Sequence, residues 1–269
     1  MKTKTMKVKN KNICDWISLL CSCFLIITSY GQECAHKIDG DIEASSGYKE
    51  GIRWFPSKTQ QSMRKIQDFF EINVNYILAE DYDGICHEFN SRNGLKNATV
   101  TIGEDFLEKY KNDPLFIEIL LAHEAGHTLQ YLYKDDAESF LGTLYGGNGI
   151  LKGKNKELQA DVIAGFYLYS EIRRRYDKAS SKQEKNDIDA QVEKSVGKFE
   201  AIADYQFTHA SHHGRFKERT QALSSGVNLA MYGFDSVRIY KNDFQGIYYT
   251  SFGIVRKWKS THRAGGFKW

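Results

Sequence analysis

Proline is scarce in this chain, whose 269 residues contain only Pro56 and Pro114. The sequence also has no low-complexity linker and no internal repeat, which excludes a repeat array and marks no boundary between two domains. Hydrophobic residues make up 41% and aromatic residues 13% of the chain, which is enough for a core, and no segment has the composition of a disordered region. We therefore expect one folded domain, residues 32–269, after a separate N-terminal segment.

Acidic residues are almost absent from that N-terminal segment, which has five lysines and one aspartate. An uncharged, largely apolar run over residues 16–32 follows the lysines, and Ser29 and Gly31 are the small residues of a signal-peptidase site. We expect residues 1–31 to be a signal peptide and the protein to be exported, to the periplasm or outside the cell. The alternative is an uncleaved membrane anchor through residues 13–30, because the 17-residue run is close to the shortest that spans a bilayer.

An excess of basic charge is also missing from the exported part. The whole chain has a net charge of +3, but residues 32–269 contain 32 basic and 33 acidic residues. The basic character therefore belongs to the N-terminal segment, and net charge gives no reason to expect nucleic acid as a partner. We expect contact with a membrane only if that segment stays uncleaved.

Cysteine is scarce as well, since Cys14, Cys21 and Cys23 lie in the N-terminal segment and only Cys34 and Cys86 remain after it. Two cysteines in an oxidising compartment favour one disulfide, which would join the N-terminal arm to the body of the domain. Two free thiols are the alternative, because spacing along the chain does not give distance in space.

Turn signals and alternating apolar residues predict a small sheet in the first part of the domain. Three segments are typical of short strands separated by Asp-Gly and Asn-Gly turns: residues 73–81, 84–90 and 97–103. Before them, Ser57 with Gln60 three residues later resembles a capping box, so we expect a helix from Ser57 to about Phe70.

Helices are expected in most of the chain after this sheet. Asp113 is a good N-cap and Pro114 a good first helical residue, and a second long helix is expected to begin near Lys156. Further helices are expected up to about residue 203 and over residues 211–234, and the alternation in residues 237–255 suggests a hairpin. The predicted class is α+β, with a small antiparallel or mixed sheet before a central helix and a mainly helical C-terminal part.

The central helix carries a His-Glu-x-x-His motif at residues 123–127. Residues four apart lie on one face of a helix, so His123 and His127 can hold one metal ion between them. Glu124 is offset by about 100°, which lets it accept a proton from a metal-bound water without being a ligand. The alternative, three polar residues facing solvent, fits poorly with the apolar residues that surround the motif on nearly every side.

A catalytic zinc needs a third protein ligand and one open position. The option of a histidine ten residues after His123 fails, because that residue is Tyr133. The segment ELQAD instead offers Glu157 as third ligand and Asp161, one helical turn later, as hydrogen-bond acceptor for a ligand histidine. The alternative is an acidic first turn that only complements the helix dipole.

The segment HEAGH followed about thirty residues later by ELQAD resembles the gluzincin zinc metallopeptidases, most of all the bacterial neutral zinc metallopeptidases. The resemblance covers about residues 86–225 and implies a zincin-like fold around one Zn²⁺ ion. It implies these roles: zinc ligands His123, His127 and Glu157, general base and then acid Glu124, and orienting residue Asp161.

The third part of the resemblance is the segment SHHGRFKERTQAL, which implies a role for His213 or Arg219 in steadying the oxyanion or forming the wall of the site. His209 and His212 lie close to His213 in the sequence, and which of the three faces the site stays open. Two departures stand out: Lys156 replaces the Asn that thermolysin-like enzymes have before the ligand glutamate, and Gly214 follows His213 where many relatives have Pro.

The sequence therefore predicts a secreted zinc metallopeptidase that acts on a peptide or protein. We expect an extended substrate to lie beside residues 97–103, and the Gly-rich loop 142–153 to act as a lid or to block the cleft. Two alternatives stay open: a catalytically inactive zincin-like binding protein, and a zinc hydrolase of a non-peptide amide or ester.

Overall fold

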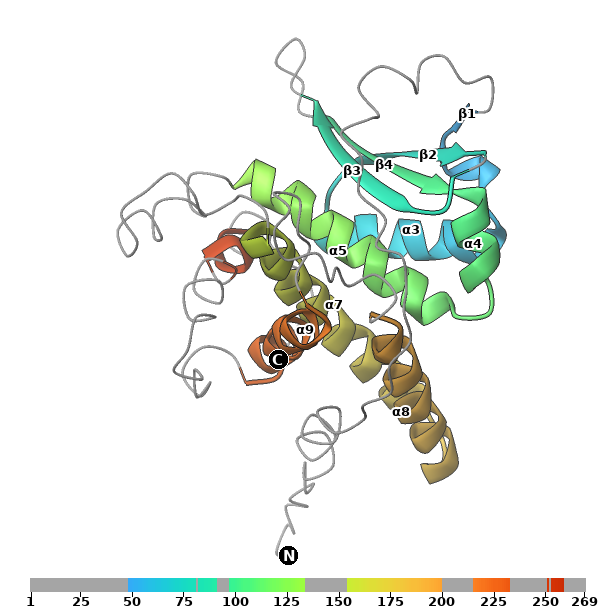
Figure 1. Cartoon of the computed structure of the whole chain (residues 1–269). Coiled ribbons are helices and arrows are strands. Elements are labelled where there is room, and N and C mark those ends of the chain that lie inside the picture. The colour runs from blue at the N-terminus through green and yellow to red at the C-terminus, as the bar shows by residue number, and fades with distance from the viewer. Residues whose placement is uncertain are drawn as a thin grey trace, which may run out of the picture. The chain divides into compact units, whose positions relative to one another are not determined.

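The computed structural model describes residues 48–80, 82–90, 97–133, 154–199, 215–232, 251 and 253–258. These residues belong to one compact unit, Gly31–Trp269, and have an α+β fold with a four-stranded mixed sheet and more helix than strand (Figure 1). None of the described helices is both long and apolar enough to cross a bilayer. The proposed signal peptide or anchor lies outside these residues and stays a prediction.

The sheet has the strand order β1-β2-β4-β3. Strands β2 (Val74–Ala79) and β4 (Asn97–Gly103) are parallel neighbours, and β1 (Tyr48–Glu50) and β3 (Ile85–Asn90) pair antiparallel on either side. The three predicted strands are confirmed to within two residues at each end. Strand β1 was not predicted, because three residues are too few for an alternating pattern.

The prediction that a substrate adds to the sheet beside residues 97–103 is wrong. Strand β4 is an inner strand, and its Ile102 lies opposite Leu78 of β2 on one side and Ile85 of β3 on the other. A strand can be added only where backbone N–H and C=O groups are unpaired. Among the described strands, β3 is the outer strand on this side of the sheet.

Helix α3 (Ser57–Phe70) has the predicted bounds but not the predicted capping box. The N-cap residue is Pro56, and no side chain caps the helix. The amide of Gln60 donates instead to the Phe55 carbonyl at 2.8 Å, so it secures the chain that enters the helix. The buried face of helix α3, which includes Phe70, packs against the central helix.

The central helix α5 (Pro114–Leu132) begins as predicted, since the Asp113 side chain accepts a hydrogen bond from the Phe116 N–H at 3.1 Å. A short helix, α4 (Glu104–Tyr110), connects it to β4. Sixteen of the nineteen residues of α5 are buried. The reason is its place in the fold, with α3 and the sheet on one side and α7 on the other (Figure 1).

The C-terminal part is helical, with α7 (Lys154–Lys178), α8 (Lys182–Gly197) and α9 (Phe216–Tyr232). Helices α7 and α9 pack closely because each has a glycine at the contact. A Cβ atom added at Gly165 would lie 1.9 Å from the Leu223 carbonyl oxygen, and one at Gly226 would lie 1.9 Å from the Val162 carbonyl oxygen. Their backbones therefore touch without intervening side chains.

The hairpin predicted over residues 237–255 is wrong at its C-terminal end, where residues 253–258 are helical. Ile254, Val255 and Trp258 are buried there, and the Trp258 indole donates to the Phe70 carbonyl oxygen at 2.7 Å. Val255 and Trp258 come one and four residues after Ile254, a spacing that places all three on one face of a helix. We had interpreted it as strand alternation; the earlier part of the predicted hairpin lies outside the described residues.

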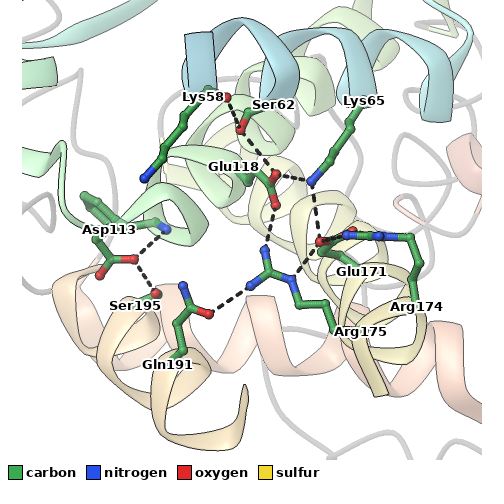
Figure 2. A network of polar contacts seen from close by, with 11 residues as sticks. Lys58, Ser62, Lys65, Asp113, Glu118, Glu171, Arg174, Arg175, Gln191 and Ser195 are labelled. Carbon is green, nitrogen blue, oxygen red and sulfur yellow. Dashed lines mark hydrogen bonds and ion pairs between the residues drawn. The ribbon is translucent and has the colours of Figure 1, made fainter. Parts of the chain in front are cut away.

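A buried charge network joins four helices away from the His-Glu-x-x-His motif (Figure 2). The carboxylates of Glu118 on α5 and Glu171 on α7 are only 3% and 4% exposed, and Lys65 of α3 lies 2.7 Å and 3.6 Å from them. Arg175 contacts both carboxylates, and Arg174 donates twice to Glu171.

Burial alone would raise the pKa of Glu171, but the two arginines lower it to about 2. Gln191 of α8 completes the network through a 2.9 Å hydrogen bond from Arg175.

Cys86 is buried in β3 and forms no disulfide with another described residue. Its predicted partner, Cys34, lies outside the described residues. The disulfide therefore stays a prediction.

Candidate metal centre

Three donor side chains from α5 and α7 converge on one point. The ligand atoms of His123, His127 and Glu157 all lie within 4.8 Å of one another. The Nε2 atom of His123 is 3.2 Å from one Glu157 oxygen, and the Nε2 atom of His127 is 3.4 Å from the other. Both histidines are buried, and the Glu157 side chain is 14% exposed. The predicted ligand set is brought together.

The chemistry of these donors fits a zinc ion. Two imidazole nitrogens and a carboxylate oxygen are a common set in catalytic zinc sites. The separations of 3.2 Å and 3.4 Å involve the two different oxygens of Glu157, and with one ligand atom from each residue the three atoms lie within 4.8 Å of one another. The three side chains could therefore hold one metal ion between them.

Small residues at one crossing point let the two ligand helices approach. A Cβ atom added at Gly126, inside the motif, would lie 3.0 Å from the Cα atom and 3.1 Å from the carbonyl oxygen of Ala160. Gly126 precedes His127 and Ala160 precedes Asp161, so the contact lies within the site itself. The short distance between these backbones brings Glu157 within reach of the histidines.

Asp161 and Arg219 support the first histidine. The Nδ1–H group of His123 donates to Asp161 Oδ1 at 2.8 Å, as predicted for a ligand histidine. Arg219 of α9 donates to both oxygens of Asp161, at 2.9 Å and 2.8 Å, and its Nη2 atom is 3.4 Å from His123 Nδ1. Asp161 is fully buried and Arg219 is 3% exposed. The structure thus places Arg219 behind Asp161, on the side of His123 that faces away from Glu157.

These buried charges compensate one another even without a metal. Burial lowers the pKa of His123, but the Asp161 and Glu157 carboxylates outweigh it and raise the pKa to about 10. Burial raises the pKa of Asp161, and Arg219 with His123 outweighs it, so the pKa lies below its ordinary value. Burial of the charges is therefore no argument for an ion by itself. The convergence of two Nε2 atoms and a carboxylate is the stronger argument.

Gln130 supports the second histidine, and sequence reasoning did not assign it a role. Its Oε1 atom is 2.8 Å from His127 Nδ1. Its Nε2 atom donates to the Lys156 carbonyl oxygen at 2.7 Å and to Gln159 Oε1 at 2.8 Å. Its position three residues after His127, polar in an apolar helix, was the only signal of this role.

His87 of β3 lies beside the centre and was also missed. Its ring is 5.7 Å from the His127 ring and stacks on Tyr131 at 6.0 Å. Its Nε2 atom is 3.0 Å from the Thr128 hydroxyl oxygen, which is 3.4 Å from the Glu124 carbonyl oxygen. Burial, and then the charge of His127, lower the pKa of His87. No motif indicates this contact, because it joins a strand to a helix 41 residues later.

Glu124 occupies the position expected of a general base. It is next to His123 on α5 and is 6% exposed. Among the described residues, no hydrogen bond to its carboxylate is found. Burial, and then the charge of Glu124, raise the pKa of Tyr76 on β2, so this charge lies close to the sheet.

Lys156 and Gly214 depart from the gluzincin pattern, and only Lys156 lies within the described residues. Lys156 donates to the Tyr131 hydroxyl at 3.2 Å and lies over its ring, so its side chain packs beside the site. The second departure, Gly214, lies outside the described residues together with His209, His212 and His213 and with loop 142–153. Their predicted roles stay untested.

No protein-family model matches this chain, and no curated protein or solved structure matches it significantly. The resemblance to the gluzincins therefore rests on the two motifs and on the geometry of the donors.

Proposed function

We propose that this protein is an exported zinc-dependent metallopeptidase with a zincin-like fold. The single observation that carries the proposal is the meeting of His123, His127 and Glu157 at one point, with Glu124 next to the first ligand. A structural zinc site needs no carboxylate beside it, whereas hydrolysis needs a base there. The presence of Glu124 thus favours a catalyst over a binding protein.

His123, His127 and Glu157 would hold one Zn²⁺ ion, as the three protein ligands of a catalytic zinc site do. A bound zinc ion supplies Lewis-acid polarisation of the scissile carbonyl and lowers the pKa of a bound water. Asp161 and Gln130 each accept a hydrogen bond from the Nδ1–H of a ligand histidine, which turns both Nε2 lone pairs toward the ion.

Glu124 moves the protons in this mechanism. Its carboxylate takes one proton from the attacking water and later gives it to the nitrogen of the leaving amine. As the amine leaves, the peptide C–N bond breaks and a carboxylic acid and an amine are the products. Arg219 holds Asp161 in place in this scheme and is a positioning residue. In this proposal, His213 is the residue that steadies the oxyanion.

Strand β3 lies beside the proposed site. It is the outer strand of the described sheet on the side of β4, and it contacts α5 next to the metal ligands through His87 and Thr128. We place the extended peptide substrate next to this strand and to the proposed ion.

The test is metal content together with cleavage of a peptide mixture by the protein from residue 32 onward. We expect about one zinc per chain, cleavage that stops with a chelator, and recovery when zinc is added back. Hydrolysis of simple esters or non-peptide amides without any peptide cleavage would replace the peptidase proposal with a different zinc hydrolase. Zinc binding without hydrolysis of either class would make the protein a binding protein.

A further inference from the structure

The orientation of the Gln130 amide is fixed by its surroundings. Its nitrogen faces the Lys156 carbonyl oxygen at 2.7 Å and Gln159 Oε1 at 2.8 Å. A backbone carbonyl only accepts hydrogen bonds, so the amide nitrogen has to be on this side. The amide oxygen, Oε1, is therefore the atom that faces His127 Nδ1 at 2.8 Å.

This orientation sets the tautomer of His127. Because Oε1 only accepts, Nδ1 of His127 has to carry the hydrogen. A neutral imidazole with a hydrogen on Nδ1 has its lone pair on Nε2. That Nε2 atom is the one that lies 3.4 Å from Glu157, on the side of the proposed ion.

The same side chain also fixes the start of the second ligand helix. The carbonyl that Gln130 binds belongs to Lys156, the residue before Glu157. Gln130 and Gln159 are each 2% exposed, so water is not available to replace these hydrogen bonds. One buried amide thus connects the second histidine ligand to the backbone that carries the carboxylate ligand.

We propose that Gln130 is the positioning residue of the metal centre for both His127 and Glu157, which rests on the proposed zinc site. The two histidines then have different supports. His123 has the Asp161 carboxylate, itself paired with Arg219, whereas His127 has a neutral amide. The neutral support depends on the geometry of one side chain.

The test compares Gln130→Met with Gln159→Met in the full mature chain. Methionine keeps the length of glutamine and removes its hydrogen bonds. Gln130→Met is expected to raise the zinc dissociation constant 10- to 100-fold, about the cost of losing such a support. Gln159→Met removes one acceptor of the amide but leaves the His127 contact, so its dissociation constant should change less than about 3-fold. Competition with a chromophoric chelator gives both values.

A second measurement separates positioning from general stability. Long-range ¹⁵N–¹H NMR spectra of the metal-free wild type are expected to show His127 as the Nδ1–H tautomer, and Gln130→Met is expected to lose that pure signature. Zinc binding by Gln130→Met as tight as the wild type, or a wild-type His127 with its hydrogen on Nε2, would overturn the proposal. Both readouts are independent of hydrolysis, so a protein that binds zinc but cleaves no peptide would sink the proposed function alone.

Discussion

Arg219 and Asp161 form a buried ion pair in which the guanidinium donates to both carboxylate oxygens across 58 residues of sequence. The pair joins α9 to α7 and contacts His123, so a proposed metal ligand, a carboxylate and an arginine form one chain of contacts. Helix α9 thereby becomes part of the support of a site whose ligands all lie on α5 and α7.

Arg219→Met is expected to destabilise the protein by about 3 kcal/mol. Loss of one partner of a buried pair typically costs about 3–5 kcal/mol, and the low end applies because His123 still contacts Asp161. Urea unfolding of the metal-free protein measures the effect. The double variant Arg219→Met with Asp161→Asn removes both charges and is expected to recover part of the loss. A single variant as stable as the wild type would show that the ion pair does not matter for stability.

Glu124→Gln is expected to keep zinc and to lower peptide hydrolysis by at least about 100-fold, the smallest usual contribution of a general base. Glutamine has the same shape but cannot accept the proton of the attacking water. Zinc content and cleavage of the same peptide mixture are measured side by side. Undiminished cleavage by this variant would remove Glu124 from the mechanism.

Gly126→Ala is expected to push α5 and α7 apart, because the new Cβ atom would lie 3.0 Å from Ala160 Cα. We expect weaker zinc binding and a loss of about 1–3 kcal/mol in stability, as for other overpacked sites. The matched control is Gly197→Ala at the end of α8, where a Cβ atom meets nothing within 4 Å. Equal behaviour of the two variants in chelator competition and thermal unfolding would contradict the close approach of the ligand helices.

Glu171 is expected to make stability depend on pH in the acid range. Its pKa in the folded protein is about 2, below the ordinary value of 4.5, so its contribution is fully present above pH 4.5 and is lost as the pH falls toward 2. The shift corresponds to about 3 kcal/mol. The difference in free energy of unfolding between the metal-free wild type and Glu171→Gln should therefore be about 3 kcal/mol smaller at pH 2 than at pH 6. A constant difference would mean that the arginines do not hold this carboxylate.

Local spacing was enough to predict the ligand cluster. His123 and His127 are one helical turn apart, as are Glu157 and Asp161, so each pair shares a helix face wherever the helix lies. The start of α5 could be predicted for the same reason, because Asp113 and Pro114 act on the first turn alone. Only the meeting of the two helices needed the structure.

Features that depend on contacts between distant elements could not be predicted in this way. Gln130 acts through a carbonyl 26 residues away, and His87 reaches the site from a strand. The sheet order likewise comes from tertiary pairing, so the alternation in residues 97–103 could not show that β4 is an inner strand. The predicted capping box failed because Pro56, and not Ser57, is the N-cap of α3.

The buried network around Glu118 and Glu171 lies on the same two helices as the proposed zinc ligands. Glu118 is five residues before His123 on α5, and Glu171 is ten residues after Asp161 on α7. Lys65 and Arg175 each contact both carboxylates, so they join α5 to α7 without any help from an ion. We therefore expect the metal-free and zinc-bound proteins to have the same fold, with the three proposed ligands already close together before the zinc ion binds.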